Sequence, residues 1–257
     1  MISHATLPSS LHPSIPLGGH GAAVIVFDPL HRFNVSRLAQ TMLHFVFSKT
    51  AEDIDEATKI TIRSIVVRSL LHVHIFRPQS WPSLLATLRS LPDYLFDKSR
   101  HKSIHRRIHS LILEDIDTFV WSMRKSNSSS LMVSSTTALA TASTNITSAV
   151  QRLSTLLSCA TILTSQSTTP LSFRPAIPTS WPQGQMVTRL AIRRVEVLKF
   201  APAISIEEAE AERAHRWDVV QKGRFECWKV GAGVRDSEGF VYRIGQAGVE
   251  IEEVQGK

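Results

Sequence analysis

Two patterns of apolar and polar residues alternate along this chain. Short, continuously apolar runs are typical of strands that helices cover on both faces, as in parallel sheets. Three such runs occupy residues 22–27, 111–113 and 159–164. Apolar residues at helical spacing predict helices over residues 35–47, 51–71 and 81–96. Strands that alternate with helices predict an α/β fold with a mostly parallel sheet and right-handed crossovers.

The C-terminal part of the chain has a different pattern. Two strands without an intervening helix close the chain, which predicts an antiparallel edge to the sheet. Strand character is found over residues 188–200, 225–228 and 240–244, with a predicted helix over 206–220.

Three stretches lack a packing pattern and are predicted to be loops. Residues 126–148 are almost entirely Ser, Thr, Ala and Asn, a composition too low in complexity for precise packing. Residues 167–185 contain four prolines, and residues 1–20 combine Pro, Ser and His with a Gly pair. We therefore expect an N-terminal loop over 1–20 and one core domain over 21–257, with mobile loops at 126–148 and 167–185. Some helix is expected near the end of the first of these loops.

Composition narrows the class of protein. Apolar content of 43% and charged content of 20% over 257 residues are those of an ordinary soluble protein, long enough for one large domain or two small ones. A net charge of +7 makes an acidic partner such as nucleic acid plausible, although the excess is modest. The two cysteines form no CxxC pair, which argues against a disulfide framework or structural zinc site and fits a reducing, intracellular compartment. No apolar run reaches the roughly 18 residues that a membrane span needs.

Polar side chains follow the predicted buried strands. Asp28 follows the first apolar run, Glu114 and Asp115 follow the run at 111–113, and Gln166 comes just after 159–164. The carboxyl ends of parallel strands are where open α/β sheets bind ligands, and an acid there can hold magnesium directly or through water. The other interpretation is a buried strand whose polar end caps the next helix.

Two histidines alternate with apolar residues over 71–76, which predicts another strand. His72 and His74 stand two positions apart and lack an obvious third metal ligand. We therefore interpret them as core or surface histidines.

Several segments together resemble the RecA-type recombinases. Residues 27–38, FDPLHRFNVSRL, resemble the second core strand and following helix of that family, and residues 111–119 resemble its Walker B strand. Further resemblances lie in the strand ending in the nucleotide-sensing glutamine, the segment after the second DNA-binding loop and the terminal hairpin: residues 162–166, 188–190 and 240–250. Order and spacing agree over roughly residues 20–250. The chain is most similar to the eukaryotic paralogues of the X-ray-repair cross-complementing group two type, in a fungal form; residues 77–97 and 117–121 support this choice.

The resemblance implies a RecA-like core and assigns roles to the polar residues. Those that would contact nucleotide and magnesium, if that binding is retained, are Asp28, Glu114, Asp115 and Gln166. In the family, the loops after the Walker B strand and after the glutamine strand face DNA. The residues that would contact DNA there are Arg124, Lys125 and Arg174 at phosphates and Trp181 on a base. Solvated loops without DNA contacts remain the other interpretation, because a Ser/Thr-rich loop with few cations is a weak electrostatic groove.

The departures from the family concern catalysis. The phosphate-binding sequence GxxxxGK[ST] is not found; Gly18-Gly19-His20-Gly21 lacks its Lys-Ser/Thr pair and precedes a strand. The family places that element just upstream of residue 22, so we expect the first core strand to be missing, with a gap beside the strand that ends at Gln166. Leu30 stands where the family has its water-activating glutamate, and an aliphatic side chain cannot orient or deprotonate water.

The expected function is therefore that of a non-catalytic subunit in homologous-recombination DNA repair in the nucleus. The resemblance implies another recombinase paralogue as partner and weak contacts with single-stranded or branched DNA, with no catalytic residues and no certain cofactor. The alternative is a DNA-dependent ATPase of the same family, binding ATP and Mg, whose P-loop is missing from this sequence. An unrelated α/β enzyme is a remoter alternative, since no G-x-S-x-G elbow, dinucleotide fingerprint or metal triad is found.

Overall fold

The chain divides into two compact units, residues Met1–Gln183 and Gly184–Lys257, each of which is described by itself. The computed structural model describes residues 1–13, 15–50, 54–127, 135–167, 175–177, 181, 185–194, 205–221, 223–231, 239–245 and 248–252. The expectation of one core domain over 21–257 thus differs from the structure. The reason is that the C-terminal strands pair with one another in a sheet of their own rather than forming an edge of the parallel sheet.

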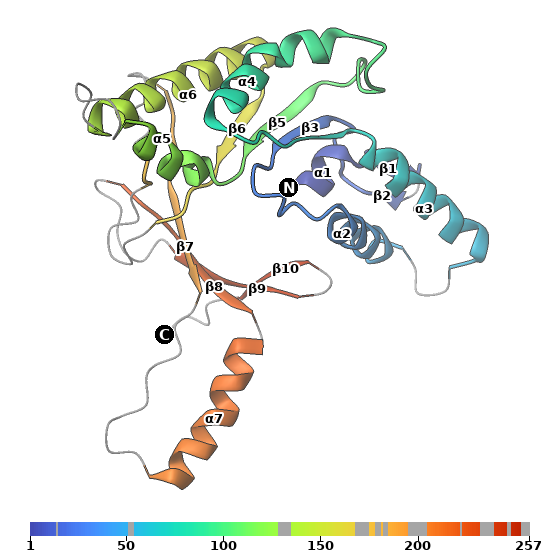
Figure 1. Cartoon of the computed structure of the whole chain (residues 1–257). Coiled ribbons are helices and arrows are strands. Elements are labelled where there is room, and N and C mark those ends of the chain that lie inside the picture. Colours follow the sequence, from blue (N-terminus) through green and yellow to red (C-terminus); the bar gives the residue numbers. More distant parts are fainter. Residues whose placement is uncertain are drawn as a thin grey trace. The chain divides into compact units, whose positions relative to one another are not determined.

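The first unit is built on a four-stranded parallel sheet with the strand order β4-β3-β5-β6 (Figure 1). Its strands are β3 (Ala23–Phe27), β4 (Val73–Phe76), β5 (Ile108–Leu113) and β6 (Ala160–Leu163). All five residues of β3 are fully buried, as its uniformly apolar sequence predicts for a strand covered on both faces. The α/β class with a parallel sheet is confirmed.

Helices cover both faces of this sheet (Figure 1). One face, with Ile25 and Leu111, packs against α4 and α6, whereas Val24 and Ile112 on the other face pack with Ala5 of α1. The helices of this unit are α1 (Ile2–Thr6), α2 (Val35–Phe47), α3 (Glu56–Leu70), α4 (Trp81–Phe96), the 3-10 helix η1 (Ile116–Phe119), α5 (Val120–Asn127) and α6 (Ser135–Leu157). None of the described helices is both long enough and apolar enough to cross a membrane.

The predicted loop over residues 126–148 is too long, because helix was expected only near its end, whereas α6 begins at Ser135 and runs through the described second half. The small and apolar residues that this helix buries in the core recur at helical spacing: Ala142, Ile146, Val150 and Leu153. Ser and Thr between them lower the apparent hydrophobicity, yet Thr147 satisfies its hydroxyl by donating to the carbonyl oxygen of Ser143 at 2.8 Å. Residues 128–134 lie outside the description.

The predicted N-terminal loop over residues 1–20 is also wrong. This segment contains α1 and a short antiparallel pair, β1 (Ser10–His12) and β2 (Ile15–Pro16). Leu7 and Leu17 are buried in a core shared with α2 and α3. Gly19 packs so closely that a Cβ at this position would lie 2.2 Å from the carbonyl oxygen of Leu7. The segment is therefore part of the hydrophobic core.

The predicted mobile loop over residues 167–185 is described only at 167, 175–177, 181 and 185. Ile177 is fully buried, and its backbone N–H donates to the Asp117 carboxylate at 3.0 Å. Trp181 is half-buried against the same core. The segment is thus packed against the core at Ile177 and Trp181, whereas Ser167 and Gln185 are exposed.

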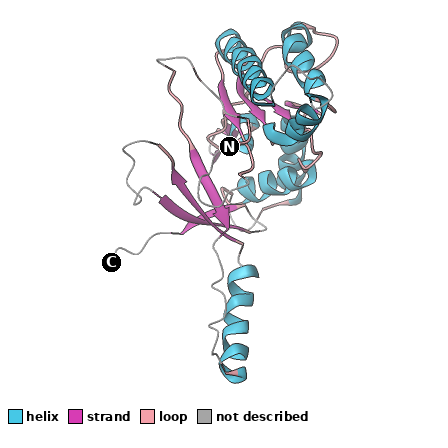
Figure 2. Cartoon of the chain, turned by 60° about the vertical axis from the view of Figure 1, so that its left-hand side comes forward, coloured by secondary structure: helices cyan, strands magenta, loops and turns pink. Residues whose placement is uncertain are grey.

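The second unit is a four-stranded antiparallel sheet with the order β10-β9-β8-β7 (Figure 2). Its elements are β7 (Leu190–Arg194), α7 (Ile206–Gln221), β8 (Arg224–Lys229), β9 (Gly239–Ile244) and β10 (Val249–Glu252). Glu252 accepts hydrogen bonds from Arg224 on β8 and Arg243 on β9, which ties three strands together across one face of the sheet.

His72 and His74 are core histidines that belong to one hydrogen-bonded network. The hydroxyl of Ser103 lies 2.8 Å from Nδ1 of His72 and 2.9 Å from Nε2 of His74. Nδ1 of His74 lies 2.9 Å from the hydroxyl of Tyr94 on α4. The network thus fastens β4 to α4 and to the connector that contains Ser103, without a charge in the core. Burial first, and then the neighbouring His101 and His72, lower the pKa of His74 to about 4.

This network predicts loss of stability in acid. The folded protein holds His74 neutral, whereas the unfolded chain protonates it near its ordinary pKa of 6.5. The free energy of unfolding should therefore fall as the pH drops below about 6.5, by on the order of 1–3 kcal/mol by about pH 4. Urea unfolding at several pH values measures this dependence. His74→Gln replaces the imidazole with an amide that can form hydrogen bonds but cannot take up the proton, so the stability of this variant should depend less on pH. Equal pH dependence of the two proteins would contradict the role given to His74.

Candidate functional site

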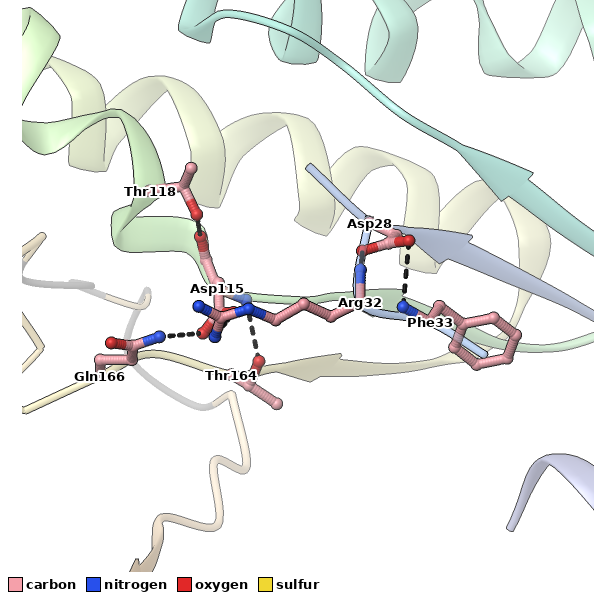
Figure 3. Close-up of polar contacts among 7 residues, drawn as sticks. All are labelled: Asp28, Arg32, Phe33, Asp115, Thr118, Thr164 and Gln166. Carbon is pink, nitrogen blue, oxygen red and sulfur yellow. Dashed lines mark hydrogen bonds and ion pairs between the residues drawn. The ribbon is translucent and has the colours of Figure 1, made fainter. Parts of the chain in front are cut away.

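Polar residues from three adjacent strands meet at the carboxyl edge of the parallel sheet (Figure 3). Asp28 follows β3, Glu114 and Asp115 follow β5, and Gln166 lies just beyond β6. Strand pairing continues into this edge, because the Glu114 N–H donates to the Phe27 carbonyl oxygen at 2.9 Å. The residues that the sequence placed after separate strands are thus brought together where open α/β sheets bind ligands.

Asp28 shapes the turn between β3 and α2. Its side chain is 1% exposed, and its two oxygens accept the backbone N–H groups of Arg32 at 2.8 Å and Phe33 at 3.1 Å (Figure 3). The guanidinium of Arg77 lies 3.7 Å from the same carboxylate. Such charge-assisted bonds from backbone amides fix the loop around the buried acid. Asp28 therefore holds the turn together without capping a helix, because the N-cap of α2 is Asn34, whose side chain accepts the Arg37 N–H.

Asp115 connects three segments of the edge. Its carboxylate accepts a hydrogen bond from the side-chain amide of Gln166 at 3.2 Å and pairs with Arg32 at 3.5 Å (Figure 3). Its backbone N–H donates to the hydroxyl of Thr164 at 2.9 Å, and its carbonyl oxygen accepts from the hydroxyl of Thr118 at 2.6 Å. Asp115 has a φ of 46°, a left-handed conformation that Asp tolerates better than most residues. These bonds hold the start of η1 against the end of β6.

Glu114 differs from its neighbours because its carboxylate makes no hydrogen bond or ion pair within the described part of the chain. It is half-buried beside two other acids. Burial raises its pKa first, and the negative charges of Asp28 and Asp115 raise it further. A cation, or a ligand that donates a hydrogen bond, would relieve this unfavourable environment. Glu114 is therefore the carboxylate of this edge with capacity to bind a ligand.

Asp117 is a site residue that the sequence interpretation did not single out. One of its oxygens accepts the Ile177 N–H, whereas the other is buried without a hydrogen-bond partner among the described residues. Burial raises its pKa, and hydrogen bonds from backbone amides, that of Ile177 foremost, oppose the shift. The available signal was a third acid within four residues of Glu114. Its role here is to anchor the segment around Ile177.

The residues predicted to contact DNA differ in how exposed they are. Arg124 is exposed, and its guanidinium carbon lies 5.5 Å from the ring centroid of Trp121, whose side chain is 75% exposed. Trp181 is half-buried and packs against the hydrophobic core. The side chain of Lys125 and the whole of Arg174 lie outside the described residues. Trp121, which sequence reasoning did not assign to DNA, is the more accessible aromatic surface.

Neither a metal site within the described part of the chain nor a comparison with known proteins identifies a ligand or a relative. Within the described residues, no group of three or more His, Cys, Asp or Glu side chains is arranged to hold a metal ion. Leu30 is 36% exposed in the turn after Asp28 and brings no acid or base to the edge.

No protein-family model matches the chain, and no curated protein matches it either.

The contrast between two carboxylates gives a stability prediction. Asp28→Asn leaves one of the two backbone N–H groups without a good acceptor, so it should lower the free energy of unfolding by about 1–3 kcal/mol. Glu114→Gln is the matched control, because removing a charge that is unpaired and half-buried should leave stability unchanged or slightly raised. Chemical unfolding at neutral pH measures both variants. Equal losses would show that Asp28 has no special role in the turn.

Proposed function

We propose that this chain is a non-catalytic subunit of a nuclear DNA-repair assembly, related to the RecA-type recombinase paralogues. It acts through protein contacts and through weak contacts with single-stranded or branched DNA. The observation that supports this proposal best is the convergence of Asp28, Asp115 and Gln166 at one sheet edge. The resemblance in the sequence assigned these residues to three separate strands, and those strands are neighbours in the order β3-β5-β6.

The state of the carboxyl edge favours a subunit over an ATPase. Asp28 is committed to the turn and Asp115 to Arg32 and Gln166, so neither is available as a base. Leu30 adds no proton-accepting group. Activation of a nucleophilic water requires a group within hydrogen-bond reach of it. Among the described acids of this edge that the resemblance assigned to nucleotide, Glu114 is the one whose carboxylate no other group engages.

An open sheet edge supports the proposed role in protein contacts. β6 ends the parallel sheet, and on the side away from β5 no described strand pairs with it. Unpaired backbone groups along a strand are a template for pairing with another chain. The partner we propose is another recombinase paralogue, as the resemblance implies. Co-expression and co-purification with individual recombinase paralogues test this part of the proposal; failure to associate with any of them would contradict it.

Trp121 and Arg124 support the proposed contact with DNA. An exposed indole can stack on an unpaired base, while a neighbouring guanidinium can contact the phosphate that follows it. Both side chains lie on α5, directly after the strand and turn that carry Glu114 and Asp115. The pair thus lies close in sequence to the carboxyl edge of the sheet.

This assignment predicts a specific loss of DNA binding. Stacking contributes about 1–3 kcal/mol per base, so Trp121→Ala should weaken binding of a single-stranded oligonucleotide by roughly five- to a hundredfold. Trp217→Ala is the matched control, since Trp217 is also exposed, at 65%, but lies on α7 of the second unit. Fluorescence anisotropy measures both affinities. The proposal of DNA contact at α5 fails if the wild-type chain does not bind or if both variants bind as it does.

The unpaired Glu114 carboxylate keeps the alternative function, an ATP- and Mg-binding ATPase, open to a direct test. We expect that a titration with Mg–ATP shows no saturable binding and no hydrolysis. Glu114→Gln serves as the comparison, because it removes the one carboxylate at this edge that the protein itself leaves unpaired. Saturable binding by the wild-type chain that this variant lacks would establish the alternative and overturn the non-catalytic assignment.

A further inference from the structure

Protonatable and cationic side chains gather at the opposite, amino-terminal edge of the parallel sheet. They come from four separate segments: α1, the turn before β3, the end of α2 and the start of β5. This group, which we call the amino-edge cluster, comprises His4, His20, Lys49, Arg107 and His109. It uses none of the residues at the carboxyl edge.

Contacts connect the three histidines of the cluster, and the Phe45 ring bridges His4 and Lys49. The rings of His20 and His109 stack with centroids 5.4 Å apart and planes 19° apart. The His20 N–H donates to the carbonyl oxygen of His4 at 2.8 Å, which sets the turn before β3 beside α1. The His4 ring meets the edge of Phe45 at 4.4 Å, and the Lys49 ammonium lies 5.9 Å from the centroid of that same phenyl ring. His4, His20 and Lys49 are exposed, so the cluster is open to solvent.

The cluster lacks a compensating acid. Burial lowers the pKa of His4, and the positive charges of the Met1 amino group, His20 and Lys49 lower it further. The pKa of His109 falls through burial first and then through His20, Arg107 and the same amino group. No carboxylate of the described residues is among the groups that act on either imidazole. Within the described residues, no carboxylate forms an ion pair with Lys49 or Arg107, the lysine and arginine of the cluster.

One buried polar atom in the cluster is also unpaired. Nδ1 of His109 is buried and has no hydrogen-bond partner among the described residues. The neighbouring Arg106 is already engaged, since its guanidinium donates to the carbonyl oxygen of Thr6 at 3.4 Å. Buried polar atoms are nearly always hydrogen-bonded in native proteins, so an unpaired one indicates a ligand or water that completes the site.

We propose that the amino-edge cluster binds a phosphate group. Ammonium, guanidinium and imidazolium groups all donate hydrogen bonds to phosphate oxygens, and these charge-assisted bonds are among the stronger ones in proteins. A bound anion supplies the negative charge that the cluster lacks and stabilises the protonated imidazoles. The phosphate belongs either to a small molecule or to the backbone of a nucleic acid. This inference stands independently of the proposed function, because its residues lie at the other edge of the sheet.

Binding is expected to depend on pH in a definite direction. Without the anion, burial first, and then the positive charges around them, from His20, Lys49, Arg107 and the Met1 amino group, lower the pKa values of His4 and His109. The anion raises their proton affinity, so protons are taken up on binding and affinity increases as the pH falls. At constant ionic strength, sulfate, a phosphate analogue whose charge does not change in this range, should bind about fivefold or more tightly near pH 6 than near pH 7.5. Inorganic phosphate itself takes up a proton in this range, which works against the trend.

The experiment follows the histidine imidazole signals by NMR while inorganic phosphate is added to the full chain, with sodium chloride holding ionic strength constant. Saturable shifts of His4, His20 and His109 are expected, and His20→Ala should weaken phosphate binding by about fivefold. His31→Asn is the control: His31 is an exposed histidine at the carboxyl edge, and Asn tolerates its φ of 57°. The control variant should bind phosphate as the wild-type chain does.

A second titration with a single-stranded thymidine oligonucleotide distinguishes the two sources of phosphate. If the oligonucleotide shifts the same histidine signals and competes with phosphate, the cluster takes a nucleic-acid backbone; if only phosphate does so, it takes a small phosphate compound. Either result supports the site. Shifts that chloride alone reproduces, or an unchanged affinity in His20→Ala, would overturn it.

Discussion

The first unit depends on the complete burial of β3. A strand with no exposed residue needs parallel neighbours on both sides and helices over both faces, and β4, β5 and the two helical layers meet these needs. Within β3 this leaves no place for polar side chains except at its two ends, whereas in the neighbouring β4 the buried His74 is held in a hydrogen-bonded network. Acids lie at the carboxyl edge, two of them paired with Arg32 and Arg77, and histidines and cations lie at the amino edge. The central hydrophobic strand thus separates two groups of polar residues.

Hydrophobic patterning predicted this arrangement where side chains were strongly apolar. The strand over residues 22–27 and the helix over 81–96 agree with β3 and α4, and the polar residues after the predicted strands do meet. Patterning failed over residues 135–148, where small residues make the buried stripe of α6, and over residues 1–20, where a short helix packs through Ala5 and Leu7. In both cases polar residues or prolines between the buried positions mask large side chains such as Leu7 and Ile146, which are fully buried.

The hydrogen bonds and ion pairs of individual side chains were harder to predict than the positions of those side chains at the strand ends. The sequence placed Asp28 at a strand end but could not show that two backbone N–H groups already occupy its carboxylate. It likewise gave no reason to separate Glu114, which is unpaired, from Asp115, which binds Arg32 and Gln166. These differences arise from the path of the turns, which residue spacing does not determine. The neutral histidine network is a related case, since Ser103 joins His72 and His74 from a segment far along the chain.

The close packing of Gly19 has a consequence for how the first unit opens. A side chain at this position would collide with the carbonyl oxygens of Leu7 and Pro8, so Gly19 and the segment after α1 can only sit together or separate together. The N–H of Ala22, which bonds to Ala5, and that of Gly21, which bonds to Leu7, depend on the same contact. In hydrogen-exchange terms, we expect these amides to open together as one unit at the entrance to β3. We expect Gly19 thereby to link hydrogen exchange in the N-terminal segment to hydrogen exchange at the amino edge of the sheet.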